Sequence, residues 1–232
     1  LDITRLHTQL SQFCKGVPFP HPDFTPDNLA QRLLLVYWPV WLADAHLRGE
    51  WDAVFGYDYQ VKSAREQMGN AGWTSQTVVK TRVNDEPRKG LIDRHYDNVL
   101  APAIATHANR IAQLGEYDLH AVHPWQATDT AQIAIQKGSL STGEVEAPVK
   151  KELTRLAALD CREASDAQHT KSYTFYGEFS DMHWTHGLLP MFTTYYEDDK
   201  GFRYVVAING QTGKVYAQRI SSTKKAWILT GI

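Results

Sequence analysis

The chain has 232 residues, of which 43% are hydrophobic and 22% are charged, and its formal net charge is −2. These values are typical of a folded protein and exclude wholesale disorder, and the length allows one large domain or two small ones, each with its own core. The near-neutral charge argues against nucleic-acid partners, which require a concentrated basic surface.

The first 32 residues are predicted to form a helical arm. Apolar residues recur every three or four positions over residues 2–15, which predicts an amphipathic helix that Asp2 can cap and Gly16 can end. The run Thr25-Pro26-Asp27 predicts the start of a second, short helix, because proline is favoured at the first helical position and an acid in the first turn.

Residues 33–165 are predicted to form a first α+β half. A continuous apolar and aromatic run over residues 33–46 indicates a strand, in which Pro39 predicts an edge, a bulge or a break. Arg48-Gly49-Glu50 is a plausible turn, followed by a partner strand over 51–59. The remaining expected elements are a loop at 61–72, a strand at 74–84, a turn at 85–90, a strand at 91–99, a helix at 101–114, a strand at 131–136 and a helix at 147–164.

Residues 166–232 are predicted to form a C-terminal β-meander half. Its expected strands cover residues 171–179, 188–197, 202–209 and 214–220, and Asn209–Gly213 is a glycine-containing hairpin turn. The segment Leu35–Trp41 is similar to residues 187–192, which favours a duplicated hairpin paired within one sheet. The expected fold class is therefore α+β, mainly antiparallel sheet with three or four packed helices and two related hairpin-centred halves.

Two histidine pairs are the strongest metal-binding candidates in the sequence. His120 and His123 form one HxxH pair, and His183 and His186 form another. Four imidazoles could make a zinc shell, so a metal-dependent hydrolase is one alternative. Neither pair lies in a convincing helix and no HExxH motif is completed, so surface or turn histidines are the favoured interpretation and no cofactor is predicted.

Other catalytic signatures are weak. The segment Gly210–Lys214 has two residues between its glycines where a phosphate loop requires four, and a strand rather than a helix is expected to follow. Cys14 and Cys161 are far apart and lie in no CxxC pair, which leaves one disulfide between them open but favours two reduced thiols in a cytoplasmic protein. The protein is therefore not expected to be an enzyme.

Aromatic residues in the two hairpin blocks are the candidate interaction residues. Because side chains alternate along a strand, adjacent rings cannot enter one core, and some must be covered by a helix or a partner. The expected interaction residues are Tyr37, Trp38, Trp41, Tyr195, Tyr196 and Phe202. A pocket lined by Trp38, Trp41 and Trp51 would instead indicate a sensor for a small ligand.

Several segments resemble a poorly characterised group of bacterial proteins that often carry an N-terminal zinc ribbon and a C-terminal membrane helix. The matching segments are Tyr37-Trp38-Pro39-Val40-Trp41, Leu189-Pro190-Met191-Phe192, Asn209-Gly210-Gln211-Thr212-Gly213-Lys214-Val215 and Ser221-Ser222-Thr223-Lys224. The chain has no CxxC pair, so no zinc ribbon is expected within it: either the sequence begins after the ribbon or this member lacks one. The resemblance implies a non-enzymatic accessory role in a membrane-associated complex, and it supplies no catalytic residues.

The leading hypothesis is accordingly an interaction or scaffold module with a protein partner. Lys224 and Lys225 precede an apolar end, a pattern that leaves open a membrane anchor beyond Ile232. The expected location is cytoplasmic, with association to a membrane through such an anchor or through the partner.

Overall fold

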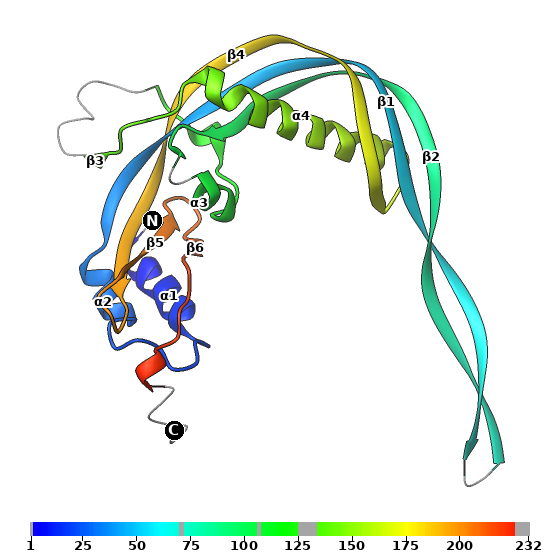
Figure 1. Ribbon diagram of the computed structural model, residues 1–232, viewed down its shortest axis with the longest axis horizontal. Helices are drawn as coiled ribbons and strands as arrows, with labels where there is room; N and C mark the ends of the chain where they lie inside the picture. Colours follow the sequence, from blue (N-terminus) through cyan, green and yellow to red (C-terminus); the bar gives the residue numbers. More distant parts are fainter. Residues whose placement is uncertain (1, 70–71, 106–107, 125–133, 226–232) are drawn as a thin grey trace. The chain divides into compact units, whose positions relative to one another are not determined.

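The computed structural model describes residues 2–69, 72–105, 108–124 and 134–225 (Figure 1). The elements are α1 (Ile3–Cys14), α2 (Pro26–Gln31), β1 (Leu34–Gly69), β2 (Gly72–Pro102), α3 (Ala108–Gln113), η2 (Leu119–Ala121), β3 (Ala134–Ile135), α4 (Thr142–Ala164), β4 (His169–Glu197), β5 (Arg203–Asn209) and β6 (Val215–Tyr216). Within this part of the chain the strands form a sheet in the order β2-β1-β4-β5-β6, and β3 pairs in parallel with β1. The expected α+β class with a mainly antiparallel sheet is confirmed.

The chain packs as two compact units, and several elements contribute to both. Unit 1 contains Leu1–Leu42, Leu100–Val145 and Trp184–Ile232, and unit 2 contains Ala43–Val99 and Glu146–His183. These limits do not coincide with the boundaries expected after residues 32 and 165, because β1, β2 and β4 each run through a unit boundary without a break.

The two N-terminal helices begin at the residues that the sequence indicates. The Asp2 carboxylate accepts a hydrogen bond from the Thr4 amide at the start of α1, and the Thr25 hydroxyl accepts one from the Asn28 amide at the start of α2. Each contact satisfies an amide that the helix itself leaves unpaired. Leu10 and Leu29 then bury completely, so the expected helical arm is part of the core of unit 1.

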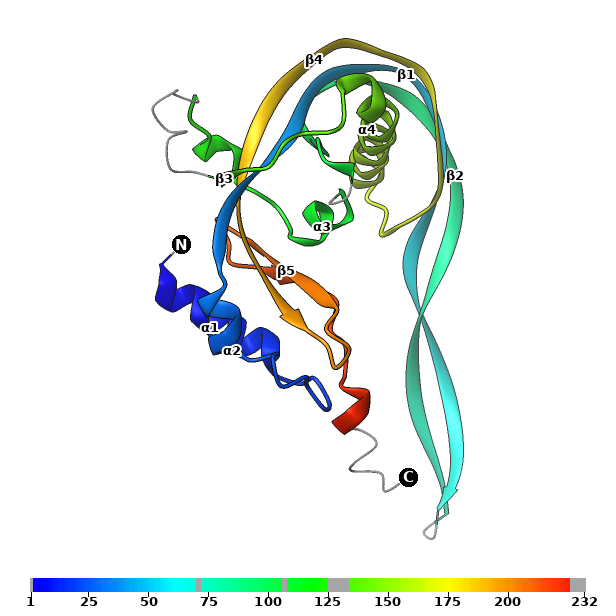
Figure 2. The same ribbon diagram turned by 60° about the vertical axis from the view of Figure 1, so that its left-hand side comes forward.

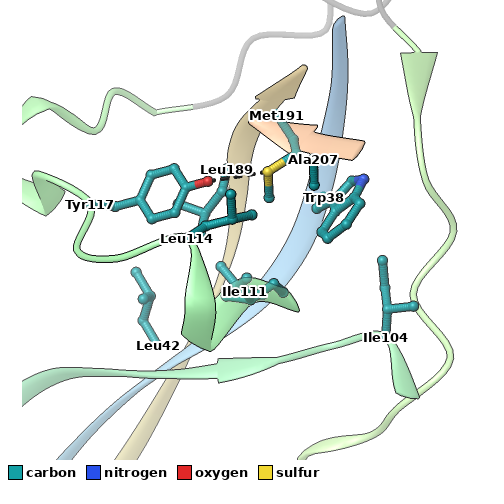
Figure 3. Close-up of a cluster of buried hydrophobic side chains, with 10 residues drawn as sticks. Trp38, Leu42, Ile104, Ile111, Leu114, Tyr117, Leu189, Met191 and Ala207 are labelled. Carbon is teal, nitrogen blue, oxygen red and sulfur yellow. Dashed lines mark hydrogen bonds between the residues drawn. The ribbon is translucent and has the colours of Figure 1, made fainter. Parts of the chain in front are cut away.

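Both faces of the sheet in unit 1 are covered. One face carries a cluster with Trp38, Leu114 and Met191 near its centre (Figure 3). There the Tyr117 hydroxyl donates a hydrogen bond to the Met191 sulfur at 3.4 Å. The other face packs against α1 and α2, with a second cluster made by Leu6, Leu10, Phe13, Phe24, Leu29, Tyr196, Val206 and Ile208. Each fully buried side chain of this size contributes about 1.5–3 kcal/mol, so this two-sided packing fixes the register of the sheet.

The two similar segments of the sequence lie side by side. β1 and β4 are neighbours in the sheet, and Gly187 of β4 packs against Val40 and Leu42 of β1. Pro39 does not break β1. On the side away from β4, β3 pairs with Val36 and Tyr37, whereas the Ala103 amide just after β2 donates to the Pro39 carbonyl at 3.2 Å. Proline therefore occupies the position where the neighbour of β1 changes, which is where a missing N–H is tolerated.

Three expected interruptions of the strands are wrong. The structure continues through Arg48-Gly49-Glu50 in β1, through residues 85–90 in β2, and through the segment 180–187 in β4. Most of the expected loop at 61–72 is strand as well, since β1 ends at Gly69. Gly49 thus lies inside β1 and not in a turn. Of the two segments expected to form short hairpins, only the C-terminal one does so.

Unit 2 combines curved strands with α4. Val149, Leu153 and Ala157 form the buried stripe of this helix, and it lies on the concave side of the strands (Figures 1 and 2). The backbone amide of Gln168, just before β4, donates to the Gly56 carbonyl at 3.1 Å. β4 therefore begins beside this point of β1, as the third strand next to β1 and β2. Farther along, β1 and β2 continue as a twisted two-stranded ribbon, as expected for a pair without a third strand.

Two helices and two strands differ in length from the sequence predictions. α3 covers Ala108–Gln113 rather than 101–114, while α4 begins at Thr142 rather than residue 147. β6 is limited to Val215–Tyr216, where a strand to residue 220 was expected. β3 covers Ala134–Ile135, and residues 131–133 of its expected range lie outside the described residues.

Candidate functional site: an arginine–aromatic surface in unit 1

Two of the expected interaction residues belong to the core. Trp38 and Tyr196 are buried in opposite clusters of unit 1, and both were expected to face a partner. The Tyr196 hydroxyl donates to the Gln218 carbonyl at 2.7 Å and accepts from the Ile220 amide at 3.2 Å. Burial raises the pKa of this phenol. Both rings bury a large apolar area in the core, and the backbone satisfies the polar end of Tyr196.

Tyr195 lies on the other face of β4, as alternation along a strand requires. Its half-buried ring has the Arg32 guanidinium at 5.0 Å from its centroid and the Arg203 guanidinium at 4.8 Å. A cation near the face of an aromatic ring is attracted by the negative face of its quadrupole. The two arginines come from the segment after α2 and from the start of β5, so three parts of the chain meet at this ring.

Arg32 is fixed in place by Asp23. Its two terminal nitrogens donate to the two carboxylate oxygens of Asp23 at 2.6 and 2.7 Å, a bidentate pair. The same carboxylate accepts the Glu197 amide at 2.9 Å. The hydrogen bonds from Arg32 hold the pKa of Asp23 below its ordinary value. This pairing gives the guanidinium a defined orientation beside Tyr195.

Exposed apolar side chains continue this surface along the chain. Phe202, which precedes β5, is 62% exposed, and Val205 is 36% exposed. Because Tyr195 and Val205 are paired residues of neighbouring strands, their side chains share a face. We define Arg32, Tyr195, Phe202, Arg203 and Val205 as the Tyr195 surface. Tyr195 and Phe202 were expected from the sequence, whereas the arginines were missed.

A polar depression adjoins the Tyr195 surface. It has a volume of about 290 Å³ and is lined by Arg110, Arg203, Tyr204, Val205, Tyr216, Ala217 and Gln218. We call it the arginine pocket. It shares Arg203 and Val205 with the Tyr195 surface, and no acidic residue is among those that line it.

The remaining aromatic candidates do not form one site. Trp41 is half-buried, donates its indole N–H to the Leu140 carbonyl at 3.0 Å, and makes edge contacts with Trp184 and His186. Tyr37 is half-buried in β1. Trp51 is buried in unit 2, where it stacks on Tyr173. The arginine pocket is lined by none of the tryptophans expected for a small-ligand sensor.

The histidine pairs do not converge. His183 and His186 are both in β4, and because they are three positions apart their side chains leave opposite faces of the strand. His120 is in η2 and His123 follows it, and both are exposed. In the part of the chain that the structure describes, no group of three or more His, Cys, Asp or Glu residues is arranged to hold a metal ion.

The Asn209–Gly213 turn has a structural role. Asn209 is fully buried, and its side-chain amide donates to the carbonyls of Leu114 and Glu116, each at 3.3 Å. Its side-chain oxygen accepts the amides of Gln211 and Thr212. One side chain therefore closes the turn and fixes the segment after α3, which gives a physical reason for asparagine at this position.

A second buried polar cluster joins both ends of unit 1. The Nδ1 atom of His21 lies 3.1 Å from Asp199, and the Ser222 hydroxyl donates to the other oxygen of Asp199 at 2.6 Å. Asp199 lies between His21 and Ser222, so the Ser222 hydroxyl donates to a carboxylate and not to an imidazole. A serine nucleophile requires an imidazole or similar base beside its hydroxyl, and this cluster does not supply one. Pro20 also forms an antiparallel bridge with Ser221. The cluster fastens the segment 221–225 to the N-terminal link.

Cys14 and Cys161 are both free thiols. Burial raises the pKa of Cys14 to about 11 and raises that of Cys161. A higher pKa lowers the fraction of reactive thiolate, and so neither thiol has the properties of a catalytic nucleophile.

None of the helices in the described residues has both the length and the apolar character needed to cross a membrane. The expected anchor beyond Ile232, with the apolar residues 226–232 before it, falls outside the residues that the structure describes.

Comparison with known proteins gives no assignment. No family model, curated protein or solved structure matches the chain.

Proposed function

We propose that this protein is a non-enzymatic interaction module, an accessory subunit of a membrane-associated complex in the cytoplasm, and that the Tyr195 surface binds its protein partner. The observation that carries the proposal is the Tyr195 ring held beside two guanidiniums, with Phe202 exposed next to Arg203 in the chain. Tyrosine and arginine are, with tryptophan, enriched among the residues that dominate binding energy at protein interfaces.

The local geometry also favours binding over chemistry. Arg32 is oriented by Asp23, so part of the surface is ordered before a partner arrives. A preorganised surface loses less conformational entropy on association. Covering Phe202 would remove a large apolar side chain from water, a gain of up to about 1.5–3 kcal/mol.

A photo-cross-linking experiment tests the proposal. A benzophenone amino acid is placed at position 202 or, as a control, at position 91, in cells that produce the protein. Leu91 is 79% exposed on β2 in unit 2, so it is a matched exposed apolar position away from the Tyr195 surface. We expect position 202 to yield one discrete adduct with another protein, identified by mass spectrometry, and position 91 not to yield it.

A substitution then links the adduct to the surface. Tyr195→Ala in the chain that carries the cross-linker should reduce the yield of the adduct at least about tenfold, as for a residue central to an interface. Equal adducts from positions 202 and 91, or a yield that Tyr195→Ala leaves unchanged, would refute the proposal.

A further inference from the structure

The arginine pocket lies at an open edge of β5. The Asn209 amide donates to the Lys214 carbonyl, so the backbone groups of Asn209 point toward β6. Backbone direction alternates along a strand, and the N–H and C=O of Val205 therefore point to the same side. β6 ends at Tyr216, and the segment 216–218 lines the pocket instead of pairing with this part of β5. The pocket thus contains backbone polar groups that no strand covers in the described structure.

Two cationic side chains line the same depression. Arg203 donates its Nε to Glu197 at 2.9 Å, and its terminal nitrogens have no hydrogen bond to any of the residues that the structure describes. Arg110 comes from α3, a separate element. Guanidinium groups together with a backbone N–H are the donors that proteins use to bind oxyanions.

The size of the pocket limits its ligand. Pockets for cofactors and drug-sized ligands usually measure about 300–1,000 Å³, and this one lies just below that range at about 290 Å³. It is therefore at the small end of ligand pockets, where a side chain or a chain end fits. A side chain or chain end that carries a carboxylate fits within this volume, and the two carboxylate oxygens match the planar donor fork of a guanidinium.

We propose that the arginine pocket binds a carboxylate group of the partner protein while the aromatic part of the Tyr195 surface binds the neighbouring side chains. This inference rests on the proposed function for the identity of the ligand. Arg203 belongs to both sites, so an acidic residue or a free chain end of the partner would reach the pocket from a segment lying on Tyr195. Capture of a carboxylate beside an exposed strand edge is a recurring mode of peptide recognition.

The test is a titration of the complete chain by two-dimensional NMR with three short peptides. The first, Gly-Ala-Glu-Glu-Ala-Gly with both ends blocked, offers side-chain carboxylates. The second, Gly-Ala-Gln-Gln-Ala-Gly with a free carboxyl end, offers a terminal carboxylate, and its fully blocked form is the neutral control. We expect the amide signal of Val205 to shift with one or both of the charged peptides and not with the neutral one, and the stronger binder identifies the source of the carboxylate.

Substitutions assign the binding to the pocket. Arg203→Gln and Arg110→Gln should each lower the affinity for the charged peptide about tenfold. Arg203→Lys keeps the positive charge but loses the planar donor fork of the guanidinium, and so should have an intermediate effect. Arg82→Gln is the matched control, because Arg82 is an exposed arginine of β2 in unit 2. It should leave the affinity unchanged.

Several outcomes would overturn the inference. These are equal binding of charged and neutral peptides, equal effects of Arg110→Gln and Arg82→Gln, or tighter binding of inorganic phosphate than of either charged peptide. If position 202 still cross-links to a protein while no carboxylate peptide binds, the interaction module stands and the carboxylate pocket fails. If a peptide binds through Arg110 and Arg203 but no adduct forms, the pocket stands and the proposed partner surface fails.

Discussion

Gly49 of β1 lies directly against Gly177 of β4 in unit 2. A Cβ atom on Gly49 would overlap the backbone of Tyr176 and Gly177, and a Cβ on Gly177 would overlap the backbone of Arg48 and Gly49. The two strands therefore approach each other more closely here than side chains allow. A glycine inside a strand often marks such an approach of another backbone.

We predict that Gly49→Val destabilises the protein by about 3 kcal/mol, since the new side chain would force the two strands apart. The free energy of unfolding in urea measures this. Gly143→Ala is the control, because a Cβ on Gly143 meets no atom within 4 Å. It should be neutral or stabilising by up to about 1 kcal/mol, because alanine is the better helix former. Similar losses in both variants would contradict the close approach.

The second prediction concerns the turn that Asn209 closes. Asn209→Ala removes the partners of two backbone carbonyls and two backbone amides at once. Leaving buried polar groups unpaired should cost about 3 kcal/mol of unfolding free energy. Asn84→Ala should change stability by less than about 0.5 kcal/mol, because the exposed side-chain amide of Asn84 donates only to the half-buried Glu86 among the described residues. A loss below 1 kcal/mol for Asn209→Ala would show that the turn forms without this side chain.

The third prediction is a pH dependence that comes from Asp199. The Ser222 hydroxyl, and after it His21, hold the pKa of this carboxyl below its ordinary value. A depressed folded-state pKa adds stability above the unfolded value of about 4, and this stability is lost as pH falls through the folded pKa.

Asp199→Asn should therefore lower the urea midpoint at pH 7, and the difference from the original chain should shrink as pH falls below about 4. The groups facing Asp199 are His21, Ser222 and Lys224, whose amide lies at 3.3 Å. Asp27→Asn is the control, because its carboxylate is 80% exposed and pairs only with His7 among the described residues. A difference that is the same at pH 7 and pH 3 would show that the charge of Asp199 contributes nothing.

The fourth prediction concerns the two-stranded ribbon. The contacts of His46 with His95 and of Trp51 with Gly90 set a register that places Gln60 opposite Thr81. Replacing residues 61–80 by Asn-Gly, a favoured two-residue hairpin turn, should shorten the ribbon without disturbing the core of unit 2. Described side chains on this ribbon are largely exposed, among them Tyr59, Met68 and Val79.

We expect the free energy of unfolding of the shortened chain to lie within about 1 kcal/mol of that of the original, because exposed positions contribute little to stability. Circular dichroism during thermal unfolding measures this, and size-exclusion chromatography shows whether the oligomeric state is unchanged. A loss of several kcal/mol would mean that the ribbon supports the core. The matched control is Gly49→Val, which changes a covered part of the same strand.

The sequence predicts the fold class and the helix starts because these depend on local chemistry. Asp2 and Thr25 accept bonds from amides only two or three residues away, so their roles are visible in a short window. The alternation that separates Tyr195 from Tyr196 is equally local. The polar turn at Asn209–Gly213 follows from the conformations that asparagine and glycine allow.

The lengths of the strands and the composition of the Tyr195 surface could not be predicted in this way. Gly49 and Gly90 lie in sequences typical of turns. In the structure, Gly49 meets the backbone of a neighbouring strand and Gly90 meets a tryptophan ring on one. Arg32 and Arg203 are 171 positions apart and acquire their role only when β4 brings Tyr195 between them. Each of these facts depends on pairing between distant segments, and a single sequence does not encode that pairing locally.

The path of the chain between the two units has a consequence for how the protein folds. The chain passes from one unit to the other inside β1, β2, α4 and β4, so no single cut releases either unit as a continuous piece. Unit 2 cannot be completed until His183 has been made, and unit 1 also needs residues beyond it. Folding must therefore wait for contacts between distant parts of the chain, which makes it slow compared with a helical protein of this size.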